Sequence, residues 1–305
     1  MSFVRLCGTD DRAAWLKARR TGLGASEAPA LFGIGFRSLL EHYLEKTGDE
    51  PEGDEPEEES EVLRWGRLLE PLILNEFSRE TGRRVEHGGQ LLRSREHPWM
   101  LCTLDAEQFC PKRKTPGIVE GKATRWLAGE WLEGEVPRRI WIQVQQQLAV
   151  TGRSWGSVCV LLFGSQFLWS DIERDDTFIN EALISAGADF WKRVQERRPC
   201  PPDGTDSARK ALQRLYPEHV PGKVVNLGGE LVEFDGELQA LEKDAKAIKS
   251  RIDHIKQSLC MAIGDAEFGA LANGVTYSHK LQHRGAYTAE ATSFRVLRRH
   301  APKGR

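Results

Sequence analysis

The segment 118–123 reads IVEGKA and places a glutamate and a lysine two positions apart. Side chains of a β-strand alternate between its two faces, so Glu120 and Lys122 should project from the same face. Asp105 lies fifteen residues before Glu120, after the run LCTL. An adjacent strand could bring its carboxylate next to Glu120, and two carboxylates at one place need a cation. The pattern predicts a metal site with a lysine beside it; the alternative is an exposed, ion-paired hairpin.

Glu70 is a third candidate ligand. If the run RWGRLLEPLIL is helical, the neighbours of Glu70 at three and four positions are mostly apolar: Gly66, Arg67, Ile73 and Leu74. An unpaired carboxylate would be costly there, so Glu70 needs a partner. Either Arg67 supplies it as an ion pair, or Glu70 shares a metal with Asp105 and Glu120. Pro71 removes a backbone donor beside Glu70, and such a local conflict is easier to explain at a functional site than in plain scaffold.

The elements that must position these residues follow from capping residues, breakers and apolar spacing. Helices are expected from Asp10 or Asp11 to Arg19 and from Ser60 to Thr81. A short helix capped by Ser26 is expected between them. Three short β-rich runs follow, at 84–93, 100–109 and 117–124. Pro137 should open a helix with a buried face, before strands at 155–163 and 166–172 and a helix over 176–197. A small mixed sheet with helices is therefore predicted.

Composition excludes several classes of protein. No apolar run reaches the roughly 18–20 residues that span a bilayer, and no signal sequence is recognisable, so we expect a cytoplasmic protein. The six cysteines show no pairing typical of zinc sites, which also argues against a four-cysteine iron–sulfur cluster. The net charge of −2 hides a strong asymmetry, because residues 49–61 hold nine acidic residues and the rest of the chain carries +7. We expect these residues to form a solvated, flexible loop.

Beyond the break CPPDG the chain changes character. Two series of apolar residues recur every seven positions, three residues apart, which predicts a coiled-coil helix. The series are Leu238, Ala245, Ile252 and Leu259, and Leu241, Ile248, Ile255 and Ala262. A hairpin turn at Asn273-Gly274 then leads to a basic tail. The seam either promotes self-association, as part of an arm that could also guide DNA, or packs against the rest of the same chain.

Taken together, five stretches in order resemble the lambda exonuclease and YqaJ-type viral recombinase family. They are WLKAR with GAS (Trp15–Arg19 and Gly24–Ser26), WG with LEP (Trp65–Gly66 and Leu69–Pro71), TLD (Thr103–Asp105), EGK (Glu120–Lys122) and QVQ (Gln143–Gln145). The resemblance covers about Trp15 to Arg197. It implies an α/β (α+β) fold with the restriction-endonuclease-like PD-(D/E)xK core. We therefore expect a YqaJ-like exonuclease domain over residues 1–200 and a C-terminal helical, coiled-coil region over 201–305.

The resemblance also implies an activity, namely Mg²⁺-dependent 5′→3′ exonuclease action on linear double-stranded DNA that leaves 3′ single-stranded overhangs for phage-type recombination. Hard oxygen ligands favour Mg²⁺, with Mn²⁺ as a substitute. The catalytic residues would be Glu70, Asp105, Glu120, Lys122 and Gln143. The metal ligands would be Glu70, Asp105, Glu120 and the carbonyl of Gly121. The residues that bind the 5′-phosphate would be Arg19, Ser26, Thr103 and Gln143.

Expected partners are double-stranded DNA ends, a phage single-strand annealing protein and further copies of the chain, with a trimer suggested by ring-forming relatives. Two other functions fit the same motifs. One is an endonuclease or repair nuclease of the same fold, and the other is a catalytically inactive DNA-binding scaffold protein. Trp126, Trp131 and Trp141 could stack on unpaired bases or pack in the core.

Overall fold

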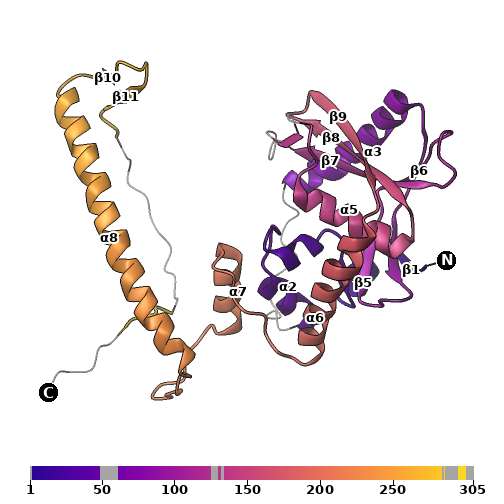
Figure 1. Ribbon diagram of the computed structural model, residues 1–305, viewed down its shortest axis with the longest axis horizontal. Helices are drawn as coiled ribbons and strands as arrows, with labels where there is room; N and C mark the ends of the chain where they lie inside the picture. Colours follow the sequence, from indigo (N-terminus) through magenta and orange to yellow (C-terminus); the bar gives the residue numbers. More distant parts are fainter. Residues whose placement is uncertain are drawn as a thin grey trace. The chain divides into compact units, whose positions relative to one another are not determined.

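The computed structural model describes residues 2–48, 61–124, 130–131, 134–283, 285 and 295–299 (Figure 1). The chain divides into two compact units, Met1–Pro217 and Glu218–Arg305. Most of the acidic segment, residues 49–60, lies outside the described residues, as do Trp126, Arg284, Lys303 and Arg305.

The first unit is a mixed α/β structure, as the fold class predicts, built from two sheets and the helices around them (Figure 1). Its elements are β1 (Phe3–Gly8), α1 (Arg12–Arg19), β2 (Leu23–Gly24), the 3₁₀ helix η1 (Ala28–Phe32), α2 (Leu39–Thr47), α3 (Glu61–Thr81), β3 (Arg84–His87), β4 (Gln90–Ser94), β5 (Met100–Thr103), β6 (Ala106–Phe109), β7 (Gly117–Thr124), α5 (Arg138–Thr151), β8 (Trp155–Leu162), β9 (Gln166–Glu173), the π-helix η2 (Phe178–Leu183), α6 (Ile184–Gln195) and α7 (Asp206–Leu215). The strand orders are β1-β4-β5-β2 and β3-β6-β7-β8-β9.

Two helices, α3 and α5, pack on opposite faces of the five-stranded sheet. Val119 of β7 packs with Ile73, Leu74 and Phe77 of α3 in one apolar cluster. On the other face, Ile118 of β7 and residues of β8 pack with the apolar stripe of α5, in a second cluster that includes Ile142, Val144, Leu148, Val158 and Val160. The alternation of β7 side chains therefore sends Glu120 to the α5 side of the sheet, as the strand pattern predicts.

The runs 84–93 and 100–109, each expected to be one strand, are both broken in the middle. Together they form one long hairpin that bends, so β3 and β6 join the five-stranded sheet while β4 and β5 join the other. At the bend, Gly88 N–H donates to the carbonyl of Asp105 at 2.9 Å. A Cβ on Gly88 would lie 2.1 Å from the Leu104 carbonyl oxygen, so only glycine allows this close approach. Asp105 thus lies at a corner rather than within a strand.

Several local expectations are confirmed, and one is wrong. Asp11 caps α1 by accepting from Ala14 N–H at 3.0 Å, and Pro137 immediately precedes α5. The helix after the acidic segment continues through Pro71 to Thr81. Ser26 is not a helix cap, because η1 begins after Glu27 and has no side-chain cap. The sequence patterns did not reveal β1 or α2.

The first unit extends past the proline-rich break at residues 199–202, where we expected the division near residue 200. Helix α7 packs on α2, since Ser207 Oγ accepts from Ser38 N–H at 2.8 Å and Arg214 pairs with Glu41 at 3.1 Å. Ala208 and Ala211 of α7 are buried. This packing keeps the chain in the first unit as far as Pro217.

The second unit consists of the long helix α8 (Glu230–Ile263) and the hairpin of β10 (Phe268–Ala270) and β11 (Thr276–Ser278). The expected turn is present, with Gly274 in the left-handed region at φ +85°. Tail residue Arg299 pairs with Asp235 of α8 at 2.7 Å. In the described part of the chain, no helix has the length and apolar character needed to cross a bilayer.

Two glycine positions test the packing with the same substitution. In Gly187→Ala the new Cβ would lie 2.2 Å from the buried ring of Trp99, and we expect the free energy of unfolding to fall by about 1–3 kcal/mol. Gly66→Ala in α3 meets nothing within 4 Å, so it should raise this free energy by up to about 1 kcal/mol through helix propensity. Urea unfolding followed by circular dichroism measures both changes. Equal effects of the two substitutions would contradict the packing of α6 on Trp99.

Candidate metal and phosphate site

The structure brings Asp105 and the Glu120–Lys122 segment together. Ala106 of β6 pairs with Val119 of β7, so Asp105, one residue before β6, lies beside Glu120. Its Oδ2 accepts a hydrogen bond from Gly121 N–H at 2.9 Å. A Cβ at position 121 would be 3.9 Å from this oxygen and in ordinary contact with α3. Gly121 therefore leaves room for the Asp105 carboxylate beside β7, and an alanine at position 121 would also fit.

Glu120 is the most constrained residue of the group, with only 2% of its surface exposed. Its Oε1 accepts from Lys122 Nζ at 2.5 Å and from Gln143 Nε2 at 2.6 Å. Its Oε2 accepts from Gln147 Nε2 at 2.6 Å. A buried carboxylate is tolerated when charged and hydrogen-bonding groups replace water, which these three donors do.

Sequence reasoning missed Gln147. The signal was present, because Gln143 and Gln147 are four residues apart and so share one face of α5. The two glutamines between them have structural roles. Gln145 donates to the Glu173 carbonyl at 2.9 Å, and Gln146 donates to the carbonyls of Leu23 and Leu101 at 2.8 and 3.0 Å. Gln146 thereby ties α5 to the parallel pair β2–β5.

Glu70 lies half-buried on α3, on the edge of this group. Burial and the charge of Glu120 raise its pKa, while Lys122 and His87 act in the opposite direction. Burial and Glu120 likewise hold the pKa of Asp105 well above its usual range. Burial alone would lower the pKa of Lys122, but Glu120 and Asp105 raise it overall. Three carboxylates facing one lysine leave a surplus of negative charge that a cation would relieve.

The donor set fits a hard divalent cation. Glu70, Asp105 and Glu120 offer carboxylate oxygens, and Gly121 offers a main-chain carbonyl between Glu120 and Lys122. The three carboxylates do not, however, form a ready-made trio. In the described ranges, the group of three possible ligand atoms within 4.8 Å of one another is elsewhere, at Glu27, His42 and Glu45. A cation at the first site would therefore draw the carboxylates closer together.

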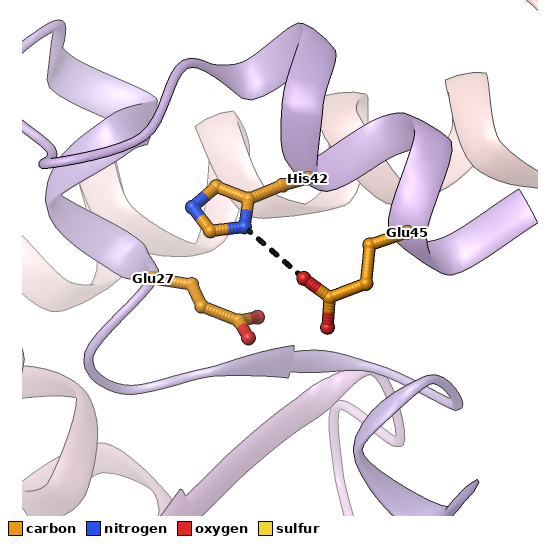
Figure 2. Close-up of side chains that lie close together, drawn as sticks. All are labelled: Glu27, His42 and Glu45. Atoms are coloured by element: carbon orange, nitrogen blue, oxygen red, sulfur yellow. Dashed lines mark ion pairs between the residues drawn. The ribbon is translucent and has the colours of Figure 1, made fainter. Parts of the chain in front are cut away.

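The Glu27, His42 and Glu45 cluster, shown in Figure 2, is best explained by ion pairs. Lys46 Nζ lies 2.9 Å from Glu27 and 3.3 Å from Glu45, so a buried ammonium already neutralises this place. Burial would raise the pKa of Glu27, but Arg19 and Lys46 outweigh it and hold that pKa below its usual value. Arg19, Arg37 and Lys46 pair with Glu27 and Glu45 and leave no surplus of negative charge for a metal.

The residues predicted to bind a 5′-phosphate are only partly assembled. Arg19 pairs with Glu27 and lies over the ring of Trp15, 4.8 Å from its centroid. Trp15 Nε1 in turn donates to Thr103 Oγ1 at 3.3 Å, which links Arg19 to the end of β5. Ser26 is exposed in the turn before η1. Strand β5 ends at Thr103, so Thr103 and Asp105 do not lie on one strand.

Of the three tryptophans considered for base stacking, two can be placed. Trp131 is buried, with 4% exposed, which excludes stacking on a base in this conformation. Trp141 packs on Phe178 with ring centroids 4.7 Å apart. Core packing therefore explains the position of the Trp131 side chain and much of the surroundings of Trp141.

An E-x-K strand, an aspartate at the adjoining corner and a glutamate on the covering helix define a candidate site for metal-assisted hydrolysis within an α/β core. Residues 14–154 match the YqaJ-like viral recombinase domain, and this range contains the whole candidate site. This match confirms the resemblance seen in the five motifs.

The chain is also similar to individual proteins. The protein YqaJ of Bacillus subtilis (strain 168) is 29% identical over 267 residues, which cover 86% of this chain and 81% of YqaJ. An alkaline exonuclease from Laribacter hongkongensis, LHK-Exo, has 21% identity and a TM-score of 0.49, covering 61% of this chain and 93% of its own. A phage-related exonuclease from Haemophilus somnus 129PT has 13% identity and a TM-score of 0.43, covering 58% and 96%.

The excess of negative charge predicts a pH-dependent gain in stability for Asp105→Asn. Because the pKa of Asp105 is raised on folding, its ionisation above the ordinary value of about 4 destabilises the metal-free protein. The asparagine can still accept from Gly121 N–H but carries no charge. We expect a higher melting temperature than wild type at pH 8, in chelator, and a difference that shrinks towards pH 4.

Differential scanning fluorimetry across this pH range measures the effect. Asp203→Asn serves as the control because Asp203 is exposed and lies far along the chain. A melting temperature for Asp105→Asn that stays below wild type at pH 8 would contradict the raised pKa.

Proposed function

We propose that this protein is a metal-dependent 5′→3′ exonuclease that digests linear double-stranded DNA and leaves 3′ single-stranded overhangs. The observation that carries the proposal is the buried Glu120, held by Lys122, Gln143 and Gln147 beside Asp105. These donors replace water around Glu120, but the neighbouring carboxylates of Glu70 and Asp105 leave an excess of negative charge. The YqaJ-like viral recombinase domain over residues 14–154 supports the same function.

Glu70, Asp105, Glu120 and the Gly121 carbonyl would hold the cation. Mg²⁺ is the proposed ion and Mn²⁺ a substitute, because all these ligands are hard oxygens. When bound, such an ion supplies charge neutralisation for the phosphodiester and activation of water.

Lys122 is proposed to stabilise the phosphate. Its raised pKa keeps the ammonium protonated at neutral pH, so it acts as a fixed positive charge and hydrogen-bond donor. Lys122 Nζ already donates to Glu120, which orients it within the site. The side-chain amide of Gln143 donates to Glu120 and so orients that carboxylate. We propose that Gln143 also orients the water or the terminal phosphate.

Polarity would be set by a pocket for the 5′-phosphate made of Arg19, Ser26, Thr103 and Gln143. The guanidinium of Arg19 is a planar donor suited to phosphate, and Trp15 and Glu27 hold it in place. Ser26 can offer its exposed hydroxyl. A single-strand annealing protein is the proposed partner for the overhangs, and the cytoplasm, where the free cysteines stay reduced, is the proposed place of action.

The carboxylate is tested by Glu120→Gln, which keeps the shape but removes the charge. We expect cleavage of linear duplex to fall at least about 100-fold, because a group that stabilises the reacting charge is lost. Glu173→Gln, the same change at an exposed position of β9 in the same sheet, should cleave normally. A gel assay with Mg²⁺, and the rise in melting temperature caused by Mg²⁺, are both measured.

The substrates of this assay distinguish the proposed activity from its alternatives. An exonuclease leaves closed circular duplex intact, whereas cutting of the circle would show an endonuclease. No cleavage by the wild-type protein with either Mg²⁺ or Mn²⁺ would indicate a DNA-binding scaffold. Near-normal activity of Glu120→Gln would end the assignment of the site.

The phosphate pocket is tested by Arg19→Ala against Arg20→Ala, its exposed neighbour. Lys46 keeps Glu27 paired when Arg19 is removed, so the fold should survive. We expect Arg19→Ala to reduce the preference for 5′-phosphorylated over 5′-hydroxyl duplex by about tenfold or more, the worth of one charge-assisted hydrogen bond. Arg20→Ala should leave the preference unchanged. Digestion of end-labelled duplexes gives both rates, and an equal loss on both substrates would disprove the pocket.

A further inference from the structure

Helix α8 carries a continuous apolar seam that nothing covers within the described part of its unit, apart from its C-terminal end. The seam residues, which follow the spacing of positions a and d, are Leu231, Phe234, Leu238, Leu241, Ala245, Ile248, Ile252, Ile255, Leu259 and Ala262. No residue of α8 is buried, and Phe234, Leu241 and Ile248 are each about 60% exposed. The helix is about 51 Å long at 1.5 Å per residue. A stripe of this length is typical of a helix that pairs with another helix.

The residues that flank the seam divide by charge. At positions e and g the first half of the helix is acidic, and the second half is basic. The acidic residues are Asp235, Glu237, Glu242 and Asp244, and the basic ones are Lys249, Arg251 and Lys256. In a coiled coil these flanking charges set the partner and the orientation.

We propose that the seam is a docking surface for α8 of a second copy of this chain, in an antiparallel two-stranded coiled coil. With the two helices centred between Lys246 and Ala247, an a position of one helix faces a d position of the other. Ala245 then faces Ile248 of the partner subunit, and Leu238 faces Ile255 of the partner subunit. Leu231 faces Ala262 of the partner subunit, so the seam is used along its whole length.

The same register pairs opposite charges on both flanks. Glu242 meets Lys249 of the partner subunit, and Asp244 meets Arg251 of the partner subunit. Two-fold symmetry repeats each pair. Asp235 comes near Lys256 of the partner subunit, although within one chain it is already paired with Arg299. No like charges face each other at these flanking positions of α8.

A parallel arrangement, in two strands or three, would place like charges together. A residue at g then meets the e residue of the next heptad in the neighbouring helix. Glu237 would meet Glu242 of the partner subunit, and Arg251 would meet Lys256 of the partner subunit. In the parallel arrangement, Asp244 and Lys249 of the partner subunit would form an attractive pair. The charge pattern therefore selects the antiparallel pair and disfavours a parallel bundle.

The first test uses the full-length chain and light scattering after gel filtration. Wild type should have a mass of two copies of 34.4 kDa, or a multiple of two copies. Glu242→Lys with Asp244→Lys turns both attractive pairs, with Lys249 and Arg251 of the partner subunit, into repulsive ones and should halve that mass. The control is Glu233→Lys with Asp253→Lys, which changes the charge of α8 equally at positions outside the flanks and should leave the mass unchanged. A monomeric wild type, or a mass unaffected by the flank variant, would overturn the proposal.

Orientation is tested by disulfide formation in chains whose exposed Cys260 is replaced by serine. Leu238→Cys and Ile255→Cys are made as separate chains with tags of different mass, mixed, and oxidised. Antiparallel pairing puts position 238 beside position 255 of the partner, so the mixture should form a mixed disulfide. Each chain alone should not crosslink, because two copies of position 238 would be about 25 Å apart, well beyond the roughly 7 Å limit between Cα atoms. Crosslinking of each chain with itself would instead show a parallel arrangement and overturn the proposal. Since neither test measures cleavage, their outcome is independent of nuclease activity.

Discussion

The burial of the Glu120 carboxylate is the constraint around which the domain is arranged. A charged group with 2% of its surface exposed must find donors within the protein. Lys122 supplies one from the same strand face, while Gln143 and Gln147 supply two from α5. The helix must therefore lie with its glutamine face towards β7. Gln146, on the same helix, holds β2 against β5 and so fixes the turn that carries Ser26 and Glu27.

A bend in one hairpin gives the site its second carboxylate. The two halves of the hairpin enter different sheets, and the close approach of Gly88 to Leu104 makes the corner sharp. Asp105 occupies this corner, where its backbone is no longer tied to a strand and its carboxylate reaches Gly121 N–H. The resulting group of carboxylates carries more negative charge than its lysine can balance. Such local conflict costs stability and is typical of a site whose charge is completed by a ligand.

Charge is handled in the opposite way around Arg19. There the acids and bases match, since Glu27 and Glu45 surround the buried ammonium of Lys46 and Glu27 also holds Arg19. The contrast separates two clusters of acidic residues, of which the Glu27, His42 and Glu45 cluster is the more compact (Figure 2). One is balanced and orients an arginine, and the other is unbalanced and suited to a cation. In the second unit, the charged residues that flank the seam of α8 favour an antiparallel over a parallel pair of helices.

The sequence by itself determined the fold class, the limits of β7 and the pairing of Glu120 with Lys122 on one face, because strand alternation is a local rule. It also determined the spacing of the seam on α8 and the Asp11 cap. Only the tertiary structure decided that two expected strands break and enter different sheets, which moved Asp105 to a corner and separated it from the strand of Thr103. The role of Glu27 beside Lys46 and the packing of α7 on α2 were equally inaccessible, because each depends on contacts between residues far apart in the chain, which no local pattern specifies.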